Sequence, residues 1–134
     1  MKNKIYLLVS FVFLSFYSAP CFSQCRTWTG HLEEKELMEN YVWYRDCLKL
    51  NKYEKAFPFW EKVYKAAPDV DARKTNIYTD GVLLYTRKFN LTKSKKDKIK
   101  IVKMINQLVV EKENCYPGGE PIILAEEIVN FMNK

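Results

Sequence analysis

Apolar side chains recur every three or four positions along most of the chain after about residue 31, with polar residues between them. In one stretch, Leu37, Tyr41, Tyr44 and Leu48 are spaced by four, three and four residues, which lines one face of a helix. Alternation with a period of two, the sign of a half-buried strand, is not sustained anywhere. The pattern therefore predicts an all-α protein.

Five helices are expected, and the short connections between them make consecutive helices antiparallel neighbours. Their expected ranges are 32–49, 52–67, 74–89, 94–114 and 121–133. Local signals support several of the ends. Asn51 suits a left-handed helix stop, Ser94 and Asp97 form a capping-box pattern, and Pro121 suits the first turn of the last helix.

Two residues, Pro58 and Gly81, are unfavourable inside these helices when each helix is considered in isolation. Pro58 lies inside the second helix, where it removes a hydrogen bond and strikes the carbonyl four residues back. A break before Pro58 is one solution, and a continuous but kinked helix is the one we favour. Gly81 lies inside the third helix and costs about 1 kcal/mol relative to alanine there, so we expect a neighbouring element to pack closely against it.

The second helix carries an aromatic, a small residue and a large aromatic, and a proline follows it. These positions, with the preceding turn residue, are Asn51, Tyr53, Ala56, Trp60 and Pro68. Repeats of about 34 residues with this half-motif are of the tetratricopeptide type. The chain thus resembles the tetratricopeptide-repeat family, which implies a short α-solenoid of stacked helix pairs. The second repeat lacks the alanine, aromatic and proline half.

A closer resemblance is to the exported tetratricopeptide-like proteins of Bacteroidota. It covers about residues 41–132 and is carried by the stretches 56–60 and 76–81, a lysine-rich helix start and the turn Gly118-Gly119. Pro58 and Gly81 belong to those stretches. The resemblance implies a scaffold of the periplasm or outer membrane and no activity.

Residues 1–23 have the layout of a secretory signal peptide. Lys2 and Lys4 precede an apolar run from Ile5 to Phe16, and Cys21 and Ser23 put small residues before a cut at Gln24. The run is too short for a transmembrane helix. A lipid anchor is the alternative, although neither Cys21 nor Cys25 has a fitting lipobox. We therefore expect an exported chain with one helical domain at 24–134, in the periplasm, at the outer membrane or secreted.

The net charge is +6 for the whole chain and +4 without the leader, whose only charged residues are Lys2 and Lys4. This mild excess does not indicate a nucleic-acid partner. The densest basic run is a candidate for contact with anionic lipid or lipopolysaccharide. It comprises Lys93, Lys95, Lys96, Lys98 and Lys100, within a helix start at 93–103.

Three cysteines remain after the leader, so at least one is unpaired within the chain. Alternating helix directions place Cys25 and Cys115 at one end of the stack and Cys47 at the other. If a disulfide forms, we expect it to be Cys25–Cys115, with Cys47 a buried thiol.

Candidate chemistry is sparse. His31 is the only histidine, and the helix dipole is a sufficient reason for Glu33, Glu34 and Glu36. We therefore expect no enzyme activity, catalytic residue, metal or cofactor. The expected function is an adaptor that binds a protein or peptide partner, and the alternative is a module that docks on anionic envelope lipid. Four of the tyrosines on the expected helices are candidates to contact a partner, provided that they are exposed. They are Tyr41, Tyr44, Tyr78 and Tyr85.

Overall fold

The computed structural model describes residues 25–71 and 73–134, and the expected leader at 1–23 lies outside them. The described part contains the helices α2 (Glu34–Lys49), α3 (Tyr53–Ala66), α4 (Asn76–Leu91), α5 (Lys95–Cys115) and α6 (Glu126–Met132). Within it, β-pairing is limited to one bridge between Thr27 and Val70. The prediction of an all-α array of five helices is confirmed, and the first four helices end within two residues of the expected positions.

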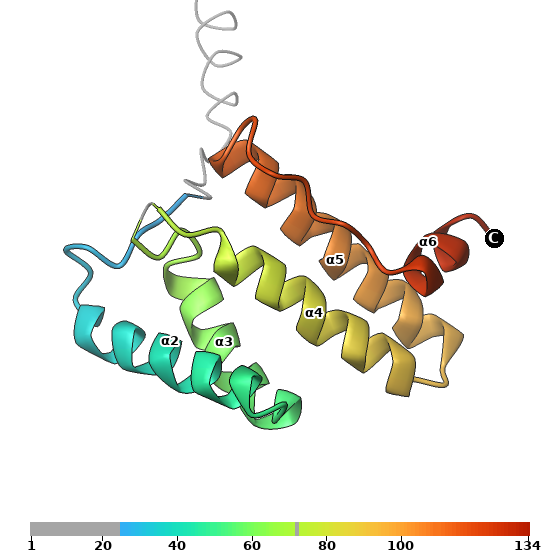
Figure 1. Cartoon of the computed structure of the whole chain (residues 1–134), viewed down its shortest axis with the longest axis horizontal. Coiled ribbons are helices and arrows are strands. Elements are labelled where there is room, and N and C mark those ends of the chain that lie inside the picture. The colour runs from blue at the N-terminus through green and yellow to red at the C-terminus, as the bar shows by residue number, and fades with distance from the viewer. Residues whose placement is uncertain (1–24, 72) are drawn as a thin grey trace, which may run out of the picture.

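The helices pack mainly with their neighbours in the chain. α2 pairs with α3, α4 pairs with α5, and α3 joins the two pairs by contacting α4 (Figure 1). Asn51 has a positive φ of 55° and turns the chain between α2 and α3. This is the left-handed helix stop expected from an asparagine at this position. Ser94 caps α5 by accepting a hydrogen bond from the Asp97 amide at 3.3 Å. The arrangement is a small helical array; its tetratricopeptide-type solenoid character stays a prediction.

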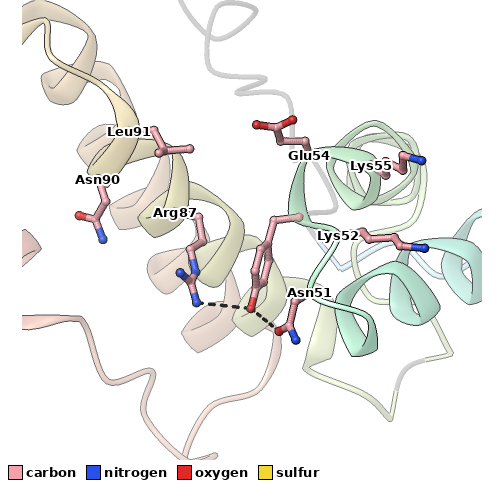
Figure 2. Close-up of a pocket in the computed structure, with 8 residues that line it drawn as sticks. Asn51, Lys52, Glu54, Lys55, Arg87, Asn90 and Leu91 are labelled. Atoms are coloured by element: carbon pink, nitrogen blue, oxygen red, sulfur yellow. Dashed lines mark hydrogen bonds between the residues drawn. The ribbon is translucent and has the colours of Figure 1, made fainter.

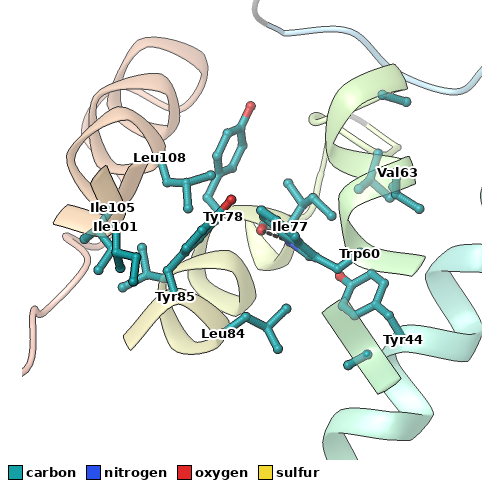
Figure 3. Packing of buried hydrophobic residues seen from close by; sticks show 14 of the residues in the cluster. Tyr44, Trp60, Val63, Ile77, Tyr78, Leu84, Tyr85, Ile101, Ile105 and Leu108 are labelled. Carbon is teal, nitrogen blue, oxygen red and sulfur yellow. Dashed lines mark hydrogen bonds between the residues drawn. The ribbon is translucent and has the colours of Figure 1, made fainter. Parts of the chain in front are cut away.

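Trp60 lies at the centre of the array (Figure 3). Its side chain is fully buried, and its Nε1 donates to the Ile77 carbonyl of α4 at 2.7 Å. The ring stacks on Tyr64 with the centroids 5.0 Å apart, and its edge meets Tyr85 at 5.8 Å. Gly81 leaves the room on α4 that the indole occupies. The expected close packing at Gly81 is therefore confirmed, and Trp60 is a central contact between α3 and α4.

α3 runs without a break from Tyr53 to Ala66, with Pro58 inside it. The continuous helix is therefore confirmed over the separate turn. Pro58 is exposed. Pro68 follows the end of α3 and is buried.

The last helix was predicted wrongly. It covers only Glu126–Met132, and Ala125 before it is extended, with ψ 144°. Ile122 and Leu124 are partly buried against the core, whereas Ile123 between them is 89% exposed. This two-residue alternation is that of an extended segment, which runs back along α5 (Figure 1). The Lys112 ammonium, almost fully buried on α5, donates to the Glu120 carbonyl and holds the start of this segment.

Candidate binding groove

A groove runs between the start of α3 and the end of α4. Its first basin, of about 450 Å³, lies between residues 51–55 on one side and Arg87, Asn90 and Leu91 on the other. A second basin, of about 370 Å³, shares Tyr53, Glu54, Arg87 and Leu91 with the first. The two basins are therefore one continuous depression, which we call the α3–α4 groove.

Tyr53 forms the floor of the first basin, and the turn before α3 sets its position. Its hydroxyl donates to the Asn51 side-chain oxygen at 2.8 Å. The left-handed conformation of Asn51 brings these two side chains together. The face of the Tyr53 ring is turned to Arg87 of α4, whose side chain is drawn in Figure 2.

Arg87 reaches across the groove from α4 to Tyr53. Its guanidinium lies 4.6 Å from the centroid of the Tyr53 ring, and one of its nitrogens is 3.4 Å from the Tyr53 hydroxyl. The next residue of α4 is Lys88, whose ammonium lies 5.0 Å from the centroid of the ring of Phe57, one turn after Tyr53 on α3. Both cations are thus held by aromatic faces, an arrangement that stabilises their charge without a carboxylate.

The charge of the groove is predominantly positive. Lys52, Lys55, Arg87 and Lys88 line it and form no ion pair within residues 25–71 and 73–134. Glu54 is the acidic residue among those lining the two basins. The groove therefore offers four positive groups without an ion pair in the described chain, of which Lys88 also interacts electrostatically with Asp97 in the neighbouring hollow.

The second basin adds an apolar wall. Phe57 and Pro58 come from α3, and Leu84 and Leu91 from α4. Leu91 is 74% exposed although its side chain is large and apolar. Exposed apolar area beside cations can bind an amphipathic ligand, because the ligand buries apolar surface while its charges are satisfied.

Three of the four tyrosines expected to contact a partner are in the core. Tyr44, Tyr78 and Tyr85 are 0%, 0% and 8% exposed, so that prediction is wrong for them. The physical reason is that these rings fill the space between the packed helices, where burying a large aromatic side chain removes much apolar surface from water. Tyr41 is half-buried, with its ring edge against Trp28 and Tyr44.

A buried polar group accompanies Tyr44. Its hydroxyl donates to Asp80 Oδ2 at 3.1 Å, and Arg45 donates to the same oxygen at 2.6 Å. Burial, the largest effect, raises the pKa of Asp80 even though these two bonds favour its charged form. Burial also raises the pKa of Tyr44, and the charge of Asp80 adds to that shift. The group ties α2 to α4 and lines neither basin of the α3–α4 groove.

The predicted basic run lies at the turn between α4 and α5. Lys93, Lys95 and Lys96 are exposed. Lys98 is half-buried, with its ammonium 4.4 Å from the Phe89 ring centroid, and Lys100 pairs with Asp97 at 3.1 Å. Lys100 also lines a third hollow, of about 390 Å³, which shares Lys88 and Thr92 with the groove. The run therefore lies beside the groove.

The repeat-motif residues divide between the core and the groove. Ala56, Trp60, Pro68 and Gly81 are buried, whereas Asn51, Tyr53 and Pro58 line the groove. Sequence reasoning missed Arg87, Lys88 and Leu91. The one sequence signal for Arg87 and Lys88 is the preference for cations near a helix C-terminus. This preference does not distinguish a binding residue from an ordinary residue at a helix end.

The cysteine pairing is confirmed. Cys25 and Cys115 form a disulfide that joins the first described residue to the last residue of α5. Cys47 is free and partly exposed, so the expectation of a buried thiol is wrong. It lies on the side of α2 that is only partly covered, next to the turn into α3.

Among residues 25–71 and 73–134, no group of three or more His, Cys, Asp or Glu side chains is placed to hold a metal ion. In the same part of the chain, no helix combines the length and apolar character needed to cross a membrane. The sequence matches no protein-family model, and comparisons with curated proteins and with solved structures find no match.

Proposed function

We propose that this chain is an exported, non-enzymatic adaptor that binds a segment of a protein or peptide partner in the α3–α4 groove. The observation that carries the proposal is the groove itself, in which cations held on aromatic rings stand beside an exposed apolar wall. The disulfide supports export, because such bonds persist mainly in oxidising compartments. The resemblance to exported tetratricopeptide-type proteins supports a scaffold of stacked helix pairs.

A photocrosslinking amino acid at Leu91 tests this proposal. Leu91 is exposed and lines both basins, and Val110 on α5, also exposed and apolar, serves as the matched control position. After irradiation in cell-envelope extract, the Leu91 variant is expected to form a discrete crosslinked product that the Val110 variant does not form. Equal crosslinking at both positions, or none at Leu91, would argue against a partner in the groove.

A second candidate is docking on anionic envelope lipid or lipopolysaccharide. It is favoured by Lys93, Lys95 and Lys96, which are exposed and form no ion pair within the described residues. A Lys95/Lys96/Lys98→Glu variant reverses three charges of the run. If this function operates, the variant loses flotation with anionic vesicles, and unchanged flotation excludes it.

A further inference from the structure

We infer that the α3–α4 groove recognises an acidic segment of a protein, in which carboxylate side chains alternate with apolar ones. The inference rests on the proposed function and adds the chemistry of the partner.

The charge of the groove calls for an anionic partner. Lys52, Lys55, Arg87 and Lys88 line it without an ion pair in the described chain, whereas Glu54 is the one carboxylate among the residues lining its two basins and Asp97 acts on Lys88 from the neighbouring hollow. Like charges gathered in a depression raise each other's electrostatic energy, and the concave shape strengthens their combined field. A carboxylate entering the groove relieves this repulsion.

Arg87 has the geometry for a carboxylate. Its guanidinium is laid on the Tyr53 ring, and one nitrogen makes a long contact of 3.4 Å with the Tyr53 hydroxyl. The contact with the ring and the one bond to the hydroxyl use part of the guanidinium, and its remaining N–H donors can form paired hydrogen bonds to both oxygens of a carboxylate. Tyr53 is itself held by Asn51, so Arg87 is positioned before a ligand arrives. Figure 2 shows Arg87 extending from α4 toward the turn that carries Asn51.

The apolar wall distinguishes a peptide from a free anion or a lipid headgroup. Leu91, Phe57 and Pro58 lie beside the cations within the same depression. In an extended peptide, successive side chains point in opposite directions and every second one faces the same way. A segment that alternates acidic and apolar residues can thus direct carboxylates to Arg87 and Lys88 on α4 while its apolar side chains face Pro58 on the α3 wall. A flat membrane surface presents its headgroups to exposed lysines, and the floor of a groove is less accessible to it.

Selection from a random library of 12-residue peptides tests the inference. The oxidised protein, immobilised through its C-terminus, is used as wild type and as the groove variant Arg87→Gln/Lys88→Gln. Lys35→Gln/Lys103→Gln is the matched control, because it removes two exposed charges outside the groove. Arg87→Lys keeps the charge without the paired donors. Circular dichroism and thermal unfolding verify that each variant is folded.

The expected result is enrichment of peptides rich in Asp and Glu interleaved with apolar residues. Their affinity for the groove variant falls at least ~10-fold, Arg87→Lys gives an intermediate loss, and the control binds as wild type does. Raising the salt concentration weakens binding to the wild type more than to the groove variant.

Three other results would overturn the inference in different ways. Enriched peptides without acidic residues, or peptides insensitive to the groove variant, reject acidic recognition but leave peptide binding intact. No enrichment rejects the proposed function as well. A parallel flotation with vesicles of phosphatidylglycerol and phosphatidylcholine covers the lipid alternative. Vesicle binding that the groove variant abolishes, without acidic peptides, assigns these cations to a lipid headgroup instead.

Discussion

The indole of Trp60 lies against the Cα of Gly81, so that a β-carbon at position 81 would overlap the ring and come within 3.0 Å of Leu108 Cδ1. The indole cannot easily move aside, because it is fully buried and its Nε1 is bonded to the Ile77 carbonyl. The glycine that is unfavourable for α4 as an isolated helix is therefore required by the packing of α3 on α4.

Gly81→Ala is accordingly expected to destabilise the protein. Helix propensity alone predicts a gain of about 1 kcal/mol, but overpacking a filled core costs about 1–3 kcal/mol or more. We expect the clash to prevail and the free energy of unfolding in urea to fall. Asn106→Ala, at an exposed position of α5, is the control for propensity and is expected to be neutral or slightly stabilising. A more stable Gly81→Ala protein would contradict the packing described here.

Loss of the disulfide is expected to destabilise the fold strongly. Cys25 and Cys115 are 90 residues apart, and in the chain-entropy model a loop of this size corresponds to about 4–5 kcal/mol. Cys25→Ser is the better variant, because Cys115 also accepts a hydrogen bond from the Tyr78 hydroxyl. The measurement is urea unfolding of the oxidised protein, the reduced protein and the variant.

Cys47→Ser provides the control, since Cys47 is unpaired and partly exposed. It is expected to change stability little. Alkylation of the oxidised native protein is expected to modify Cys47 alone within residues 25–134. Equal stability of oxidised and reduced protein would mean that the bond does not constrain the unfolded chain.

Asp80 is expected to matter mainly as an acceptor for Tyr44 and Arg45. Asp80→Ala leaves the buried Tyr44 hydroxyl without its partner, which costs about 1–3 kcal/mol. Asp80→Asn keeps an oxygen at the same place and is expected to cost less. The free energies of unfolding of the two variants at neutral pH provide the comparison, and an equal loss would show that the charge matters more than the hydrogen bond.

The pH dependence of Asp80 has a definite sign. Burial raises its pKa, so the folded protein binds this proton more tightly than the unfolded chain does. The contribution of Asp80 to stability is therefore complete below the ordinary pKa of about 3.9 and falls as the pH rises through the higher pKa of the folded state. We expect the stability of the wild type relative to Asp80→Asn to decrease between pH 3 and pH 7, as followed by chemical unfolding. A rising difference would contradict the direction of the shift.

The buried tyrosines are expected to make the protein sensitive to alkali. Burial raises the pKa of Tyr44, Tyr64 and Tyr78 above the ordinary value of about 10. Their contribution to stability is present below about pH 10 and is lost as the pH rises further, because the unfolded chain ionises first. Tyrosinate absorbance from these rings is therefore expected to appear together with loss of helical circular dichroism. Ionisation of all tyrosines in a folded protein would contradict this.

The last helix illustrates where sequence reasoning failed. Residues 121–133 carry a helical pattern, but Lys112 holds the Glu120 carbonyl, and Ile122 and Leu124 pack as an extended segment along α5. The β-branched pair Ile122-Ile123 after Pro121 was a signal against the helix. The surface of α5 against which this segment packs is formed by residues outside 121–133, so the pattern within 121–133 does not show it.

The sequence by itself determined the first four helices with their ends, the turn at Asn51 and the cap at Ser94, because these depend on neighbours within a few residues. Helix direction was also enough to pair Cys25 with Cys115. Only the tertiary structure decided which aromatic rings are buried and which side chains line the groove. Arg87 contacts Tyr53, which is 34 positions away in the sequence. On α4, a helical period places Tyr78 and Tyr85 on a core face and Arg87 and Leu91 on an exposed face. Which face is buried depends on the packing of one helix against another, and a helical period alone does not contain that information.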